Sequence, residues 1–289
     1  MKISSHNVFE TPELGDIQPV DAVVIIGNGF DLSLGLKTSY TDFIKDNTFL
    51  SLIDEKNEFA EHLQKKSKLQ NWIDIELELS KYSTRFSEHE TRNFYNDFIE
   101  VKNQLSLYLS KIEFTKINKD SSAFKFLSTL SGYKCLIADF NYTNTYEYIR
   151  SNFKEIDLSN NKHIKIHGSI SNDNIIFGVD DRTNIRQNHI FLKKSVNDNY
   201  NTINFNDYFI QCNSVGIFGH SLGLTDHMYF KDYFKKAISQ SNKQSNKDVS
   251  IFYYNEGSRL NIHSELDILT NKSISKFKTL NNVKFINCS

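Results

Sequence analysis

The sequence predicts a doubly wound α/β fold built on one mostly parallel β-sheet. An apolar run at residues 23–26 stops abruptly at a turn with two glycines, as a buried parallel strand does before a helix. In the second half of the chain, short β-branched and aromatic segments alternate with helical patterns. Polar clusters follow four of these segments, and ligands of such sheets bind at the carboxyl ends of the strands.

Seven short segments are predicted as strands because they are apolar and rich in β-branched or aromatic residues. They cover residues 23–26, 134–139, 163–167, 175–177, 215–218, 249–254 and 283–286. Helices are predicted at residues 144–152, 225–240 and 258–271. Within the third strand, His163, Lys165 and His167 are expected to share one face, since side chains alternate along a strand.

Residues 39–131 break this alternation. Apolar side chains recur there at three- and four-residue spacing, for example from Phe94 to Leu109, which is typical of amphipathic helices. We therefore expect one α/β domain over residues 1–289, in which residues 39–131 form a helical insertion between the first and second strands and cap the strand ends. The polar segment 184–206 is either a flap near the site or an irregular loop.

Composition narrows the function classes. The chain has 34 lysines and arginines against 35 aspartates and glutamates, so its charge gives no case for nucleic-acid binding. Its apolar runs are far shorter than the roughly 20 residues that span a bilayer, and residues 1–18 lack the apolar core of a secretory signal. The three cysteines show neither pairing nor zinc-site spacing. These features predict a cytoplasmic protein with no metal and no membrane partner.

The turn after the first strand is the first candidate ligand site. It contains Gly27, Asn28, Gly29, Phe30 and Asp31. The two glycines remove side chains where the backbone turns sharply and where a phosphate or ribose could approach. The spacing is not the full G-x-G-x-x-G fingerprint of dinucleotide sites, so a purely structural turn is the alternative.

Three further strand ends carry polar residues that should converge on the same edge of the sheet. These residues are Asn141 and Thr143, then His167 and Gly168, and later Gly219, His220 and Ser221. His167 has the residue type best suited to acid/base chemistry near neutral pH, although a strand-end histidine is often structural. Asn141 could cap the next helix, but Thr143 and Asn144 are at least as good caps.

Ser221 also fits the letters G-x-S-x-G of a serine-hydrolase nucleophile elbow, which follows a strand and precedes a helix. Such an enzyme needs an acid and then a histidine downstream. The available residues are Asp226, Asp232, Asp248, Asp267 and His263. Because His263 falls in a predicted helix and not at a strand end, this interpretation is disfavoured.

One acidic cluster lies inside the helical insertion. On a helix, Asp74 and Glu78 would share one face, beside the sole tryptophan, Trp72. Such carboxylates usually form a solvated surface. The functional alternative is a pair that projects from the cap toward the strand ends and is sheltered by Trp72. No histidine stands at ligand spacing, so these acids are not expected to bind a metal.

The chain carries, in this order, the motifs IIGNGFDLSLGLKTSYTDF, NWIDIELEL, DFNYTNTYE, KIHGSI, IFG and GIFGHSLGLTDHMYF. Together, over residues 23–234, they resemble the AbiH family of bacterial phage abortive-infection proteins. More distantly, they are similar to the sirtuin-like superfamily. That likeness implies a Rossmann-type fold that binds NAD, which several bacterial defence members of the superfamily hydrolyse.

The sirtuin-like resemblance implies a role for each matching residue. Asn141 would contact the nicotinamide ribose or the attacking water, and His167 would act as the general base. Residues 27–29 would approach the pyrophosphate, and Gly219 with Ser221 would contact the adenosine half. Departure of nicotinamide leaves an oxocarbenium-like ribose, so the site needs a group that positions water, a base and shelter from solvent.

This sequence departs from the superfamily pattern at two points. Thr143 stands where an Asp usually follows the Asn by two residues, and Asn28 interrupts the usual Gly-Ala-Gly start of the first turn. Asp31 or Asp139 could supply the missing carboxylate. The sequence lacks the paired C-x-x-C motifs of the zinc ribbon found in protein deacylases, so deacylation of proteins is not expected.

We therefore expect an anti-phage effector that binds NAD or a related nucleotide and hydrolyses its N-glycosidic bond. One alternative is a nucleotide-binding sensor or partner-binding module without turnover, in which Thr143 marks a lost activity. Another is a nuclease acting on phage or host RNA, based only on Asp74, Glu78 and scattered lysines. The expected partners are a nucleotide ligand and either a second copy of the chain or a partner defence protein.

Overall fold

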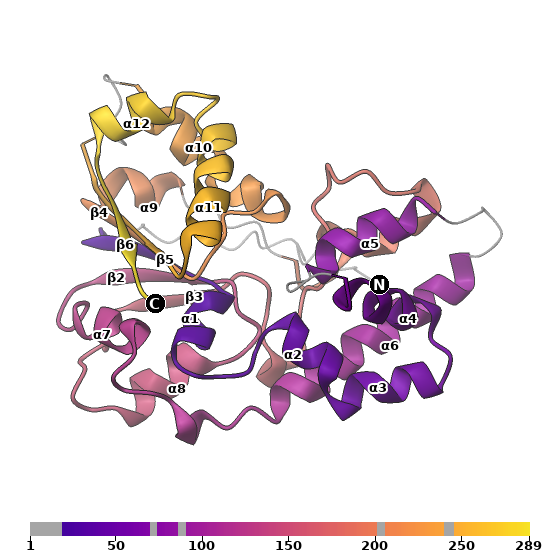
Figure 1. Cartoon of the computed structure of the whole chain (residues 1–289). Helices are drawn as coiled ribbons and strands as arrows, with labels where there is room; N and C mark the ends of the chain where they lie inside the picture. The colour runs from indigo at the N-terminus through magenta and orange to yellow at the C-terminus, as the bar shows by residue number, and fades with distance from the viewer. Residues whose placement is uncertain (1–18, 70–73, 86–90, 201–205, 240–245) are drawn as a thin grey trace, which may run out of the picture.

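The structure, a computed structural model, describes residues 19–69, 74–85, 91–200, 206–239 and 246–289. At its centre is a six-stranded sheet whose neighbouring strands are all parallel (Figure 1). In sheet order the strands are β3 (Lys162–Lys165), β2 (Cys135–Asp139), β1 (Ala22–Ile26), β4 (Ser214–Phe218), β5 (Asp248–Tyr253) and β6 (Asn282–Asn287). This is the strand order of the Rossmann fold, with a reversal between β1 and β4, and it confirms the predicted α/β class.

The predicted strand at residues 175–177 is wrong. Ile176 donates its backbone N–H to the carbonyl oxygen of His167 at 2.8 Å, so the segment runs beside the chain that leaves β3. It stays outside the sheet because Ile175 and Phe177 are buried in the core of the helical insertion. A short apolar run fits either environment, and periodicity alone does not separate them.

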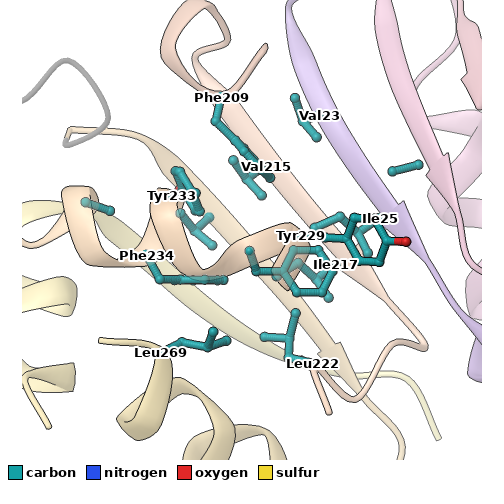
Figure 2. Packing of buried hydrophobic residues seen from close by; sticks show 14 of the residues in the cluster. Val23, Ile25, Phe209, Val215, Ile217, Leu222, Tyr229, Tyr233, Phe234 and Leu269 are labelled. Atoms are coloured by element: carbon teal, nitrogen blue, oxygen red, sulfur yellow. The ribbon is translucent and has the colours of Figure 1, made fainter. Parts of the chain in front are cut away.

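Helices cover both faces of the sheet. This matches β1, which has apolar side chains on both of its faces. Val23 and Ile25 enter one core, whereas Val24 and Ile26 enter the opposite one. The first core is covered by α9 (Asn206–Gln211), α10 (His227–Ala237), α11 (Glu256–Leu269) and α12 (Ile274–Leu280), as Figures 1 and 2 show. The second is covered by α1 (Asn28–Ser33), α7 (Ser122–Ser128) and α8 (Thr145–Asn152).

Five helices between β1 and β2 build a third core beside the sheet. They are α2 (Tyr40–Lys45), α3 (Asn47–Asp54), α4 (Glu58–Ser67), α5 (Ile75–Ser83) and α6 (Thr91–Ser110). Their apolar cluster also takes in Tyr142, Ile175 and Phe177, which follow β2 and β3, so these helices lie against the carboxyl side of the sheet. The last part of the 39–131 segment differs, since α7 packs under the sheet itself. Within the described ranges, no helix is long and apolar enough to cross a membrane.

The turns after β1 and β4 touch at the point where the strand order reverses. Gly29 donates its backbone N–H to the carbonyl oxygen of Gly219 at 2.9 Å. A Cβ atom on Gly29 would lie 2.7 Å from the Cα of Gly219, and one on Gly219 would lie 2.1 Å from the nitrogen of Phe30. Gly219 also has a φ of +68°. The space beside these glycines is therefore filled by backbone, where the sequence suggested room for a ligand.

This contact predicts that Gly219→Ala destabilises the fold by more than about 3 kcal/mol, since it combines left-handed strain with a backbone clash. Gly132→Ala is the matched control, because Gly132 has a φ of +78° and open space around its Cβ position. It should cost about 1 to 2 kcal/mol, the strain alone. Urea unfolding of both variants measures the difference. Equal losses would show that the contact between the two turns is not tight.

Candidate functional site

Polar side chains from the ends of four strands meet at one edge of the sheet, as parallel strands require. They form two groups of hydrogen bonds and ion pairs. The Asp31 cluster contains Asp31, Asn141, Thr143 and Thr145. The Asp226 cluster contains Glu76, His167, Lys194, His220 and Asp226.

Asp31 lies on α1, just beyond β1, and is fully buried. Thr143 Oγ1 donates a hydrogen bond to Asp31 Oδ2 at 2.5 Å, and Asn141 Nδ2 lies 3.4 Å from Asp31 Oδ1. Thr145 Oγ1 in turn donates to Thr143 Oγ1 at 3.0 Å. Of the two acids considered as replacements for the carboxylate missing at position 143, Asp31 is the one that contacts Thr143.

Burial raises the pKa of Asp31 to about 7. The hydrogen bond from Thr143 opposes this rise, and the negative charge of Asp139 adds to it. Near neutral pH the carboxyl group is therefore divided between its protonated and ionised forms. That condition suits a general acid or base, whose best pKa lies close to the working pH.

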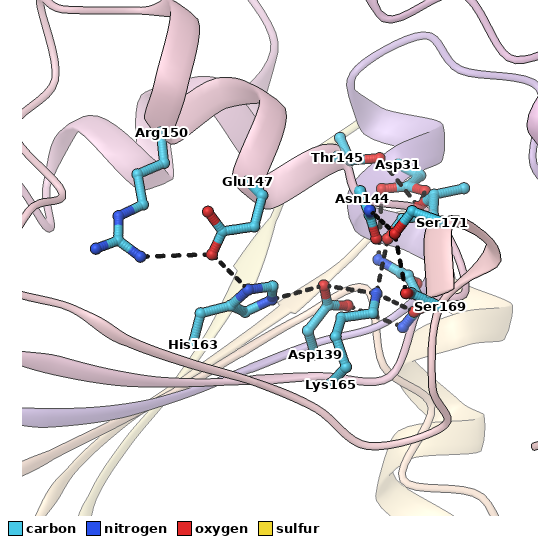
Figure 3. Close-up of polar contacts among 12 residues, drawn as sticks. Asp31, Asp139, Asn144, Thr145, Glu147, Arg150, His163, Lys165, Ser169 and Ser171 are labelled. Carbon is cyan, nitrogen blue, oxygen red and sulfur yellow. Dashed lines mark hydrogen bonds and ion pairs between the residues drawn. The ribbon is translucent and has the colours of Figure 1, made fainter. Parts of the chain in front are cut away.

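Asp139, the last residue of β2, is also buried but has two basic partners (Figure 3). His163 Nε2 and Lys165 Nζ each lie 3.0 Å from Asp139 Oδ2. Burial alone would raise the pKa of Asp139, but Lys165 and His163 outweigh it and lower the pKa. The predicted common face of His163 and Lys165 is confirmed. His167 leaves that face because β3 ends at Lys165.

Lys194 is the centre of the Asp226 cluster. It begins a short 3₁₀ helix, Lys194–Val196, in the segment predicted as a flap or loop. Its ammonium nitrogen lies 2.9 Å from Glu76 Oε2 and 3.2 Å from Asp226 Oδ1. Burial would lower the pKa of Lys194 and raise that of Asp226, but their mutual attraction outweighs burial and shifts both pKa values the other way. Lys194 and Asp226 are therefore a charged pair.

Two histidines bind the same carboxylate. His167 Nε2 lies 3.1 Å from Asp226 Oδ1, and His220 Nε2 lies 3.3 Å from Asp226 Oδ2. Leu222 donates its backbone N–H to His220 Nδ1 at 2.9 Å, so His220 donates to Asp226 through Nε2. Leu222 has a φ of +57°, which is strained for a branched side chain. This strained turn fixes the orientation of the His220 ring.

His167 is poorly suited to the role of general base that the sirtuin-like resemblance implied. Burial and the nearby Lys194 ammonium lower the pKa of His167 to about 4, against the attraction of Asp226. Its ring packs against Phe140 at 5.3 Å and Tyr142 at 6.3 Å between centroids, whereas the intervening Asn141 points to Asp31. Asn141 and His167 therefore belong to different clusters, and Asp31 is the better acid/base candidate.

Some residues of the predicted ligand turns lie at the surface. Asn28 and Ser221 are exposed, and Gly29 is half-buried, where the turns after β1 and β4 meet. The Asn28 amide oxygen accepts a hydrogen bond from Thr38 at 2.6 Å. A ligand that approaches the point where strand order reverses would meet these residues first.

Two other residues of those turns have packing roles. Phe30 is fully buried and meets Phe218 edge to face, with 5.9 Å between ring centroids. Gly168 has a φ of +70°, and a Cβ atom there would lie 2.1 Å from the carbonyl oxygen of Asn174. Both positions are explained by the fold, without a ligand.

The structure gives no support to the serine-hydrolase interpretation. His263 lies on α11, where Nδ1 is 2.9 Å from the Arg259 carbonyl oxygen and Nε2 is 3.3 Å from Lys278 Nζ. Ser221 Oγ accepts the backbone N–H of Gly223 at 3.3 Å. Both ring nitrogens of His263 are engaged away from Ser221, so these residues do not form the required pair.

The candidate cap residues differ from the predicted arrangement. Asp74 is the N-cap of α5 and accepts the backbone N–H of Leu77 at 3.1 Å, so it precedes the helix on which it was to share a face with Glu78. Glu78 is bound by His62 at 3.0 Å and Lys81 at 2.7 Å within the insertion. Trp72 lies outside the described residues. The insertion contributes Glu76 to the strand ends, and the charges of Lys194 and Asp226 also act on Asp74.

Sequence reasoning missed Glu76, Lys194 and Lys165 as site residues. Glu76 lies between Asp74 and Glu78 in the sequence, and its spacing gave no reason to prefer it over these two acids as a site residue. Lys194 lies in a polar segment with several other lysines. Only tertiary contacts distinguish these residues from solvated ones. Within the described ranges, no group of three or more histidine, cysteine, aspartate or glutamate side chains could hold a metal ion.

The raised pKa of Asp31 predicts how its replacement changes stability with pH. The folded state keeps the Asp31 proton up to about pH 7, whereas the unfolded chain loses it near 3.8. The cost of ionising the buried group therefore grows from about pH 4 to pH 7 and reaches about 4 kcal/mol. Asp31→Asn lacks this cost, so its stability relative to the parent should rise over that range. Urea unfolding at several pH values measures it, and a constant difference would contradict the buried, unpaired carboxyl group.

The buried pair predicts that Lys194→Met costs about 3 to 5 kcal/mol, because Glu76 and Asp226 lose their common cation. Lys193→Met is the matched control, since Lys193 is the neighbouring lysine and its ammonium group donates to the backbone carbonyl oxygen of Asp181 at 2.8 Å. It should change the free energy of unfolding by less than about 1 kcal/mol. Urea unfolding compares the two. Similar losses would show that Lys194 does not hold the cluster together.

Comparison with known proteins places the chain in a family. The family model described as "Bacteriophage abortive infection AbiH" matches residues 23–253, which span β1 to β5 and include both clusters. No curated protein and no solved structure matches the chain. The match covers well over half of the sequence, and the chain therefore belongs to the AbiH family of phage abortive-infection proteins.

Proposed function

We propose that this abortive-infection protein acts by binding NAD or a related nucleotide at the strand ends and hydrolysing its N-glycosidic bond. The observation that carries the proposal is the buried Asp31 carboxyl group, which is held by Asn141 and Thr143 at the carboxyl edge of a Rossmann-type sheet. Ligands of such sheets bind at that edge, next to the reversal of strand order. The exposed Asn28 and Ser221 lie at the same reversal.

The proposed chemistry uses Asp31 in its ionised form. A water molecule attacks the anomeric carbon of the nicotinamide ribose while the bond to the ring nitrogen breaks, and nicotinamide leaves with the bonding electrons. Asp31 accepts the proton released by the water, and its negative charge stabilises the oxocarbenium-like ribose. Asn141 orients the water, and Thr143 fixes the carboxylate. The products are nicotinamide and ADP-ribose.

One alternative retains nucleotide binding without turnover. It is favoured by the burial of Asp31, Asn141 and Thr143, whose exposed fractions are 0%, 6% and 1%. A sensor of this kind would bind the nucleotide at the exposed turns and leave the buried carboxyl group unreactive. The nuclease alternative is disfavoured, because Glu78 is engaged by His62 and Lys81 and Asp74 caps α5.

The proposal predicts that the purified protein consumes NAD, but not ATP or RNA, with release of nicotinamide. Asp31→Asn should lower kcat/KM by about 10² to 10⁴-fold, the contribution of a general base. Asp232→Asn, at an exposed position of α10, is the control and should leave the rate unchanged. Because the base must be ionised, kcat/KM of the parent should rise with pH and level off above about 7.

Separate incubations with NAD, ATP and RNA, followed by chromatography, decide between the candidates. Loss of NAD that disappears in Asp31→Asn supports hydrolysis. A nucleotide that raises the melting temperature but is not consumed supports the sensor. Hydrolysis of NAD at the parental rate by Asp31→Asn would contradict the role of Asp31.

A further inference from the structure

Lys165, the last residue of β3, contacts three groups at the strand ends. It pairs with Asp139 across the β2 and β3 register, and its Nζ lies 3.0 Å from Asp139 Oδ2. The same nitrogen donates to the carbonyl oxygen of Thr143 at 2.7 Å and to that of Asn141. An ammonium group has three N–H donors, so all three are used by these contacts. Its side chain is 17% exposed, which limits competition from water.

The two carbonyl groups belong to the residues that hold Asp31. Asn141 and Thr143 are both buried, and their segment lies between β2 and α8, where no regular backbone ladder satisfies it. A buried carbonyl without a donor is costly, so Lys165 fixes the backbone at positions 141 and 143. The side chains of both residues extend from that fixed backbone to Asp31.

Lys165 also sets the charge around Asp31. Among the described residues, the charges of Asp139, from β2, and Lys165, from β3, act on Asp31. Asp139 disfavours ionisation of Asp31, whereas Lys165 favours it. His163 shares Asp139 with Lys165 and continues to Glu147 at 2.7 Å, so this charge network reaches the surface through α8 (Figure 3).

We propose that Lys165 is a positioning residue of the strand-end site, which holds the backbone of Asn141 and Thr143 on Asp31 and balances the negative charge of Asp139. The inference deepens the proposed function and rests on it for its catalytic consequence. Its structural part concerns only Asp31, Asn141 and Thr143. That part is testable without any nucleotide.

The test compares Lys165→Met with Lys162→Met, which removes a lysine from the same strand. Lys162 is exposed and donates to Tyr208 at 2.7 Å, away from the site. For the parent and for each lysine variant, the free energy of unfolding is measured against pH with Asp31 present and with Asp31→Asn added. The pH dependence of the difference gives the pH at which Asp31 ionises. Lys165→Met should raise this pH by about one unit, since an opposite charge is removed. Lys162→Met should leave it at the parental value.

Kinetics with NAD give the second readout. Lys165→Met should lower kcat by about 10²-fold with a smaller change in KM, because a misplaced catalytic group affects the transition state most. If Lys165→Met does not fold, Lys165→Gln is used, which keeps two N–H donors and loses the charge. Parental ionisation of Asp31 in a folded Lys165 variant would overturn the inference, even if stability falls. If the parent does not hydrolyse NAD, the proposed function fails, while the Asp31 measurement still decides the role of Lys165.

Discussion

The site depends on one constraint: a carboxylate buried at the end of a parallel strand must be given donors or positive charge. Asp31, Asp139 and Asp226 are buried at this edge, and the insertion adds Glu76. Asp139 and Asp226 have lysine and histidine partners that keep their pKa values low, although burial acts the other way. Burial raises the pKa of Asp31 to about 7, since its side-chain partners in the described part of the chain are hydroxyl and amide groups. A lysine in contact does not by itself keep a carboxyl pKa low, since burial raises the pKa of Glu76 to about 7 although Lys194 lies 2.9 Å away.

The ion pair between Asp139 and Lys165 helps to position the residues around Asp31. Asp139 holds Lys165, which binds the backbone that carries Asn141 and Thr143. Asp226 holds His167 and, through Lys194, the helical insertion at Glu76. A buried ion pair contributes little net stability compared with an apolar contact, but breaking one is costly. Such pairs therefore specify geometry more than they stabilise the fold, and here the pair of Asp139 and Lys165 fixes the segment that contacts Asp31.

The sheet and its polar edge were predictable from sequence because they depend on local pattern. The run at residues 23–26 is apolar on both faces, and its glycine turn marks the end of β1. Asn141, Thr143 and Asp31 were identified because they follow strands directly. The segment 175–177 was misassigned because a short apolar run does not reveal what it packs against. The helix face predicted for Asp74 and Glu78 was wrong because Asp74 caps α5 and precedes its first residue. Lys194 could not be found, because only the fold brings it to Asp226.

The two clusters also differ in how a ligand could reach them. Contact with the Asp226 cluster from the side of the insertion would require Glu76 to part from Lys194, which breaks a buried ion pair. The turns after β1 and β4 offer a less costly approach, because Asn28 and Ser221 are already exposed there. Asp31 lies on the helix that starts from the first of these turns. The geometry thus favours approach of a ligand at the reversal of strand order, where side chains are exposed, over approach through the buried pair of Glu76 and Lys194.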